Sequence, residues 1–183
     1  MSLRFPRRLP WLLLIAMAII SADRITKNWV IHNVPFGGAI PVVPGLLRIT
    51  HWLNEGAAFS LFADSASPQR VRWALISFSI VAALAVLGIL YRLSQRFSLI
   101  SVALALILGG ALGNLHDRIV YSSVVDFIEV HIFSYHWPDF NVADSAIVTG
   151  ACLLLLDSLL PRRTQPTTTA ESTSESITNR SVN

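Results

Sequence analysis

Cysteine and charge are scarce in this chain. Its 183 residues include a single cysteine, Cys152, and only 14% of them are charged. One cysteine excludes an intrachain disulfide and a cysteine-based metal cage. Cys152 lies in an apolar run with no histidine near it in the sequence, so we interpret it as a packing residue and not a nucleophile. The basic residues are scattered and form no nucleic-acid-binding signature, which argues against a nucleic-acid partner.

Apolar residues, by contrast, are abundant. The chain is 53% hydrophobic and its mean hydropathy is +0.57, which is typical of a membrane protein and not of a soluble domain. A helix needs about 20 apolar residues to cross a bilayer. Four segments approach that length, and we predict them to be membrane spans: residues 11–31, 73–91, 97–115 and 142–160.

The first of these segments has a second interpretation. It follows a basic start, so it also fits a secretory signal peptide cut after Ala22. Ile20, three positions before that cut, is not the small residue that such a site prefers. We therefore favour an uncleaved first span.

The segment after the first span, residues 32–69, is divided by prolines and glycines and cannot be one long helix. Residues 46–53 are predicted to form a strand, and residues 54–56 the turn that follows it. Residues 57–63 are predicted to form a short helix at the membrane interface, since Phe59 and Phe62 suit a wet-apolar boundary.

The second long connection, residues 116–141, is predicted to be a loop whose middle, residues 123–133, forms a strand. The last residues, 164–183, are rich in serine and threonine and are predicted to be a disordered tail. The expected organisation is therefore one four-span membrane domain over residues 1–163, followed by that tail.

The distribution of charge predicts the orientation. Cytoplasmic flanks of membrane spans carry an excess of basic residues. The side that holds both chain ends has Arg4, Arg7, Arg8, Arg92, Arg96, Arg162 and Arg163. The other side has fewer arginines, Arg48, Arg70, Arg72 and Arg118, but most of the acids: Asp23, Glu55, Asp64, Asp117, Asp126, Glu129, Asp139 and Asp144. We expect both termini in the cytoplasm and a site built from acids on the outer face.

Asp126 and Asp144 are the acids that most suggest chemistry. Asp126 interrupts an apolar stretch, and Asp144 lies one turn inside the fourth span. Carboxylates at the edge of hydrocarbon are costly and point to function. The connection between them starts and ends on one membrane face, so the two can meet, share a proton and act as an acid/base pair. The structural alternative is that Asp144 caps its helix, near the good N-cap Asn141, while Asp126 is merely exposed.

Other polar residues near the spans allow two interpretations each. Asp23 and Lys27, four apart on a helix, form either an intrahelical ion pair or a polar wall of the site. Asn114 and Arg118 have the same spacing, and Arg118 either reaches the interface or holds an acid or a substrate carbonyl.

Asn54 and Gly56 have the residue types of a simple turn. Three histidines, His116, His131 and His136, lie near the acids in the sequence. They fit no usual ligand spacing, such as H-x-x-x-H on a helix, so we expect no catalytic metal.

Five short blocks, in this order, resemble the motifs of the bacterial lipoprotein signal peptidases, or signal peptidase II. The blocks are DRITK at residues 23–27, NEGAAFS at 54–60, GGALGNLHDR at 109–118, VDFI at 125–128 and FNVAD at 140–144. Each block alone is weak, but the ordered set is specific. The resemblance covers about residues 11–160 and leaves out the tail.

The resemblance implies an all-α membrane protein with four transmembrane helices, a small periplasmic β-cradle and a short interfacial helix. It implies an aspartyl protease of the bacterial inner membrane that needs no metal or cofactor and no obligate protein partner. Such an enzyme works among membrane lipid, cuts prolipoproteins just before the diacylglyceryl-modified cysteine, and is blocked by globomycin-type inhibitors.

The resemblance also assigns residues. It implies that Asp126 and Asp144 are the catalytic pair. The remaining motif positions would shape the pocket and hold the substrate: Asp23, Lys27, Asn54, Gly56, Asn114, Arg118, Asn141 and Ala143.

Two other classes of membrane protein fit the composition. A proton-coupled transporter or channel subunit would also use carboxylates in the membrane, but would spread them through its depth and often contain internal repeats. Here the acids gather at one end and we find no repeat. A membrane assembly or lipid-binding protein would use the polar residues only for packing.

Overall fold

The structure of the chain, a computed structural model, describes residues 6–56, 68–95 and 97–160. Within these ranges, four helices are long and apolar enough to cross a membrane. They are α1 (Leu9–Asn33), α2 (Pro68–Leu93), α3 (Leu99–Val120) and α4 (Val142–Leu159). The four predicted spans are confirmed. The predicted helix at residues 57–63 and the predicted tail at residues 164–183 lie outside the described residues.

Helix α3 is longer than the sequence predicted. We expected a loop from His116, and this was wrong for residues 116–120, which form the last turns of α3. In the sequence, the apolar run gives way to polar residues at this turn, and such a change is typical of the end of a membrane span. In the structure, however, Asp117 is fully buried and pairs with Lys27 of α1, at 2.8 Å, so the helix continues across a polar contact.

The strands form one antiparallel sheet in the order β1-β2-β3-β4. They are β1 (Ala39–Val43), β2 (Leu47–Asn54), β3 (Val124–Ile132) and β4 (Tyr135–Phe140). The predicted strands at residues 46–53 and 123–133 are confirmed as β2 and β3. The sequence did not predict β1 and β4, which contain Pro41 and Pro138. Both are edge strands, where a proline leaves no ladder hydrogen bond unmade.

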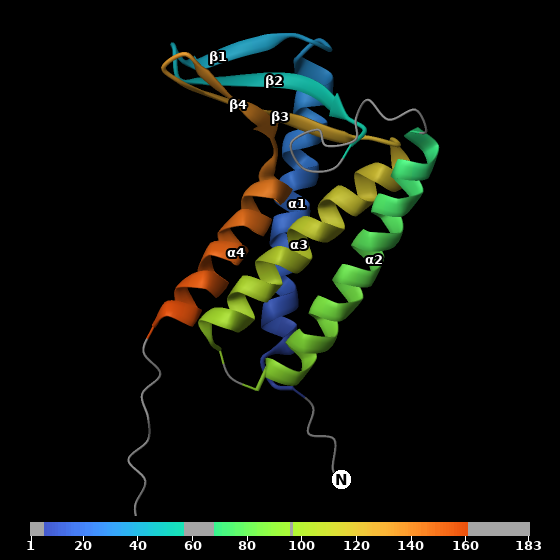
Figure 1. The fold of residues 1–183 in the computed structure, drawn as a ribbon, viewed down its shortest axis with the longest axis vertical. Helices are drawn as coiled ribbons and strands as arrows, with labels where there is room; N and C mark the ends of the chain where they lie inside the picture. Colours follow the sequence, from blue (N-terminus) through green and yellow to red (C-terminus); the bar gives the residue numbers. More distant parts are fainter. Residues whose placement is uncertain (1–5, 57–67, 96, 161–183) are drawn as a thin grey trace, which may run out of the picture.

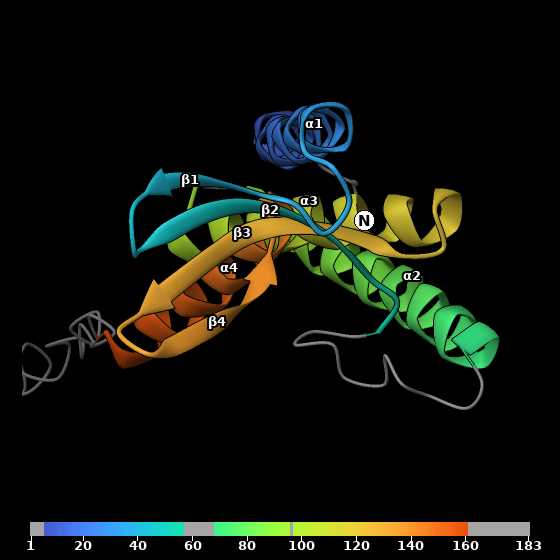
Figure 2. The ribbon, with the colours of Figure 1, turned by 90° about the horizontal axis from the view of Figure 1, so that it is seen from above.

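Figure 1 shows the sheet covering one end of the helix bundle, while both ends of the described chain lie at the opposite end. Seen from above in Figure 2, the strands pass over the ends of α3 and α4, and α1 is seen end-on beside the sheet. The start of α1 and the end of α4 therefore lie at the same end of the bundle, as an even number of spans requires.

Helix α3 is the centre of the bundle and contacts each of the other three helices. Its glycines allow the closest approaches. A Cβ at Gly109 would lie 2.8 Å from the carbonyl oxygen of Ala16 in α1, and one at Gly110 would lie 2.3 Å from that of Ala143 in α4. Small residues therefore bring the backbones of α1 and α4 against α3, as is common between helices in membranes.

The outer surface of the bundle is apolar. Phe78, Val81 and Leu84 of α2 are each more than 60% exposed, at 71%, 66% and 64%. Bare side chains of this size are costly in water but normal in a bilayer, where lipid covers them. The structure thus has the fold expected of a four-span membrane protein with a small sheet at one end.

Candidate active site

The two acids predicted to be catalytic meet beneath the sheet, where β3 passes the beginning of α4. Asp126 comes from β3 and Asp144 from the first turn of α4. Asn141 joins them: its side-chain amide donates to Asp126 Oδ1 at 2.8 Å, and its backbone N–H donates to Asp144 Oδ2 at 3.2 Å. One residue at the helix start therefore holds both carboxylates.

Asn141 is also the N-cap of α4. Its side-chain oxygen accepts from the backbone N–H of Asp144 at 2.9 Å, while Asp144 accepts from the backbone of Asn141, which completes a capping box. The structural alternative was thus right that Asp144 caps its helix. It was wrong that Asp126 is exposed, because Asp126 is only 4% accessible.

Each acid has a further amide donor. Asn54, the last residue of β2, donates to Asp126 Oδ2 at 3.0 Å. Asn114 of α3 donates to Asp144 Oδ1 at 2.7 Å. All four carboxylate oxygens of the pair therefore accept a hydrogen bond from an asparagine, and four different elements supply the groups.

A buried ion-pair network lies directly behind the pair. Lys27 of α1 is fully buried, and its Nζ lies 2.8 Å from Asp23 Oδ2 and 2.8 Å from Asp117 Oδ2. Arg24 pairs with the other oxygen of Asp117, so two cations face two acids. The charges balance, as burial in a low-dielectric interior requires.

This network connects to the pair at two points. Lys27 Nζ donates to the side-chain oxygen of Asn114 at 3.1 Å, which orients that amide toward Asp144. Asp23 Oδ1 accepts from the backbone N–H of Ala143 at 3.0 Å, next to Asp144 in the chain. The sequence offered an ion pair or a wall of the site as alternatives for Asp23 and Lys27, and the structure has both features.

Arg118 and Gly56 meet at the edge of the described site. Arg118 Nη2 donates to the carbonyl oxygen of Gly56 at 3.3 Å. Arg118 Nε is buried and has no hydrogen-bond partner among the described residues, while the backbone N–H of Gly56 donates to Asn54 Oδ1 at 2.9 Å. The structure therefore brings together all ten residues singled out in the sequence.

Asp117 and Arg24 were not singled out individually, although both lie in the motif blocks. Asp117 is fully buried and pairs with Lys27 and Arg24. The signal that could have found it is its position three residues after Asn114 and one before Arg118, on a helix that continues to Val120. Because the predicted span ended at residue 115, Asp117 was expected to lie in a loop.

The environment of Asp126 changes its acidity. Burial, followed by the negative charge of Asp144, raises the pKa of Asp126 to about 7, although the hydrogen bonds from Asn54 and Asn141 and the charge of Lys27 oppose the rise. A proton is therefore available on this carboxyl near neutral pH. Two close carboxyl groups that hold one proton between them can act as acid and base in one reaction.

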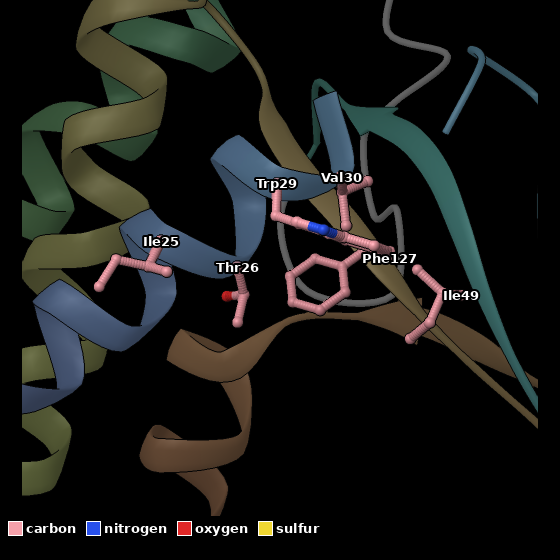
Figure 3. Close-up of a pocket in the computed structure, with 6 residues that line it drawn as sticks. All are labelled: Ile25, Thr26, Trp29, Val30, Ile49 and Phe127. Carbon is pink, nitrogen blue, oxygen red and sulfur yellow. The ribbon is translucent and has the colours of Figure 1, made fainter. Parts of the chain in front are cut away.

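Two cavities adjoin β3. One, of about 280 Å³, is lined by Asp126 together with Trp52, Leu53, Asn54, Pro138 and Asp139. The other, of about 260 Å³, is lined by Ile25, Thr26, Trp29, Val30, Ile49 and Phe127, and Figure 3 shows these side chains coming from α1 and two strands. Because Asp126 and Phe127 are successive strand residues, they point to opposite faces. Asp126 lines the first cavity, whereas neither acid lines the second, which is almost wholly apolar.

The chain matches the family model described as signal peptidase (SPase) II over residues 15–160. It is 47% identical over 150 residues to the lipoprotein signal peptidase of Ectopseudomonas mendocina, a match that covers 81% of this chain and 87% of the relative. It is 40% identical over 152 residues to that of Yersinia enterocolitica, covering 83% and 88%.

Solved structures are similar as well. A bacterial membrane enzyme determined by the in meso method at 2.3 Å resolution superposes with a TM-score of 0.73 at 30% identity, covering 85% of this chain and 94% of that chain. Another structure so described, at 1.9 Å, superposes with a TM-score of 0.72 at 31% identity, covering 85% and 95%.

Proposed function

The chain belongs to the signal peptidase II family, the lipoprotein signal peptidases, and from that premise we propose that it is a membrane aspartyl endopeptidase. Membership of the family supports removal of signal peptides from prolipoproteins. The proposal adds that the substrate is diacylglyceryl-modified, that the cut falls just before the lipidated cysteine, and that Asp126 and Asp144 activate the attacking water.

A single observation carries this proposal. Asp126 and Asp144 are 18 positions apart in the chain, yet both accept hydrogen bonds from Asn141, at 2.8 Å and 3.2 Å. Both are held at the end of the bundle that carries the sheet, with a cavity beside Asp126. This is the arrangement that a shared-proton acid/base pair requires.

The proposed reaction is hydrolysis of one peptide bond. The ionised carboxylate removes a proton from water as the water oxygen attacks the carbonyl carbon, while the protonated carboxyl donates its proton to the carbonyl oxygen. As the tetrahedral intermediate collapses, the bond from carbon to nitrogen breaks and the nitrogen receives the proton taken from water. The carbonyl oxygen returns its proton to the pair, which again holds one proton.

The position of the pair suits a lipid-anchored substrate. Extracting an acyl chain from a bilayer costs about 0.8 kcal/mol for each methylene group. A pair at the bundle end avoids this cost, because the lipid stays in the bilayer while the peptide bond reaches Asp126 and Asp144. A globomycin-type inhibitor would compete for the same cleft.

We propose the inner membrane as the location, with both termini cytoplasmic and the sheet on the periplasmic face. Arg7, Arg8 and Arg92 lie in the segments at the bundle end opposite the sheet. Basic residues flank cytoplasmic ends of spans, which supports this orientation.

The test is cleavage of a diacylglyceryl-modified prolipoprotein by the purified protein in detergent. We expect Asp126→Asn and Asp144→Asn each to lower the cleavage rate by about 100-fold or more, because each removes one partner of the acid/base pair. A chelator should leave the rate of the unchanged protein as it is.

Asp157→Asn, near the other end of α4, is the matched control and should cleave normally. Circular dichroism and the elution volume of each variant report whether it is folded. Normal cleavage by a folded Asp126→Asn or Asp144→Asn variant would refute the pair. Loss of cleavage with a chelator, at a temperature where circular dichroism shows that the protein stays folded, would point to a metal enzyme.

A further inference from the structure

The hairpin formed by β3 and β4 brings two histidines and a glutamate to one face. Glu129 and His131 are two residues apart on β3, and the 3.1 Å between Glu129 Oε1 and His131 Nε2 places their side chains on the same side of the strand. His136 of β4 is the direct cross-strand partner of His131, and therefore shares that side. The rings of the two histidines lie with their centroids 4.1 Å apart.

The candidate ligand atoms have the spacing of a metal site. His131 Nε2 and His136 Nδ1 lie 3.1 Å and 3.8 Å from Glu129 Oε1, and the ligand atoms of all three residues lie within 4.8 Å of one another. Ligands bound to Zn²⁺ at about 2.0–2.2 Å in tetrahedral geometry are about 3.3–3.5 Å from each other. Small side-chain movements would therefore bring the three atoms onto one ion.

The surroundings leave these atoms available. His131 Nε2 is buried, and among the described residues no group forms a hydrogen bond of normal geometry with it. Glu129 is held by its other oxygen, Oε2, which accepts from Arg48 Nε at 2.6 Å. The side chain of His136 is 62% exposed, so an ion can enter from solvent.

We propose that Glu129, His131 and His136 form a binding site for a late first-row divalent cation, with Zn²⁺ as the best match. Two imidazoles and one carboxylate are a donor set that Zn²⁺ accepts, with a fourth position left for water. Arg48 would not contact the ion but would orient Glu129 through the hydrogen bond to Oε2. The negative charge of Asp139 partly offsets the positive charge of Arg48, because Asp139 lies close enough to interact with both Arg48 and Glu129.

Such an ion would join β3 to β4 near the site. Glu129 is three residues beyond Asp126 on the same strand, or about 10 Å at the usual rise per residue. The ion would therefore fix the hairpin that carries Asp126 without touching the catalytic pair, and the proposed reaction would not pass through it.

The experiment is a Zn²⁺ titration of the tag-free, chelator-treated protein in detergent, followed by calorimetry and by the unfolding temperature. We expect one Zn²⁺ for each chain, and a higher unfolding temperature with Zn²⁺, because an ion that binds only the folded state stabilises it. Loss of a group that only orients a metal ligand weakens metal binding by roughly 10- to 100-fold. His136→Ala and His131→Ala each remove a ligand itself, so each should weaken Zn²⁺ binding by more than this.

His32→Ala is the matched control, since His32 is an exposed histidine at the end of α1, outside the cluster. It should bind Zn²⁺ as the unchanged protein does. The proposal fails if no saturable site is found, if a folded His136→Ala variant binds equally well, or if His32→Ala weakens binding as much as His136→Ala. Because binding is read without cleavage, these outcomes are independent of the proposed peptidase activity.

Discussion

Lys27 has no exposed surface, yet it contacts three polar partners. Its Nζ lies within 2.8 Å of both Asp23 and Asp117 and donates to Asn114 at 3.1 Å. Removing one partner of such a buried group leaves an uncompensated charge, at a cost of about 3–5 kcal/mol. The network is thus a rigid support for Asn114 and, through it, for Asp144. The same residues that make charge tolerable in the bundle also fix the geometry of the pair.

The raised pKa of Asp126, about 7, predicts a pH-dependent stability. An acid whose pKa is raised on folding stabilises the fold below its unfolded pKa of about 4, and this contribution is lost as the pH rises toward 7. Asp126→Asn removes the titration. Relative to the unchanged protein, the variant should therefore gain roughly 2–3 kcal/mol between pH 5 and pH 8. The measurement is the free energy of unfolding in detergent across this range.

The substitution also changes hydrogen bonds, because Asp126 accepts from both Asn54 and Asn141. These bonds are stronger to the ionised carboxylate, and that pH dependence is already part of the pKa of Asp126. What the substitution adds beyond it is a constant offset, so the slope and not the absolute difference tests the prediction. The raised pKa would be contradicted if the free energy of unfolding of the variant, relative to the unchanged protein, stayed constant or fell from pH 5 to pH 8.

At the scale of elements, the contact between α3 and α4 depends on Gly110. Within a helix, alanine is normally more stabilising than glycine, by up to about 1 kcal/mol. At Gly110 we expect the opposite sign, since the added Cβ would lie 2.3 Å from the carbonyl oxygen of Ala143. Gly110→Ala should lower the unfolding temperature, and should also slow cleavage because Ala143 precedes Asp144.

Gly88 of α2 provides the matched control. Apart from the neighbouring backbone of its own helix, a Cβ at this position would have no described atom within 4 Å, so Gly88→Ala should leave cleavage unchanged and keep or raise the unfolding temperature. Equal behaviour of the two variants would show that the approach of α3 to α4 does not require glycine at position 110.

The sequence predicted the elements that local composition defines, and missed those that depend on their position in the sheet or on a distant contact. The spans were predictable because apolar length alone defines them. Strand β3 was predictable from its Val, Ile and Phe content, and β2 from the turn residues that follow it. The edge strands β1 and β4 contain prolines that only an edge position tolerates. The end of α3 was missed because Asp117 becomes favourable in a helix only through Lys27, which is 90 positions away.

The same reason limited prediction of the site. Spacing made Asp126 and Asp144 candidates but left capping and exposure open, and the ordered motifs then supplied the remaining residues. The structure brings these residues together, and their roles stay a prediction. The His131 and His136 cluster was missed because the sequence was compared with helical ligand spacing, whereas a hairpin pairs residues five apart across its turn.

At the scale of the whole molecule, the orientation in the membrane is testable. In a Cys152→Ser background, we introduce single cysteines by Leu46→Cys, in the sheet end, or Gln95→Cys, between α2 and α3. The cells are treated so that their outer membrane is permeable and their inner membrane is intact. A thiol reagent that cannot cross the inner membrane should then label Leu46→Cys, and should label Gln95→Cys only after the cells are lysed. The reverse pattern would contradict the proposed orientation.

The bond from Asp23 to the backbone of Ala143 spans 120 positions of the chain. A ribosome makes α1 first and α4 last, so Asp144 emerges after every other described residue of the site. The pair is therefore incomplete throughout synthesis, and a chain that stops before α4 contains Asp126 but no second acid. Under the proposed mechanism, the cleavage activity therefore arises only when the last helix has been added, since Asp126 alone is half of the pair.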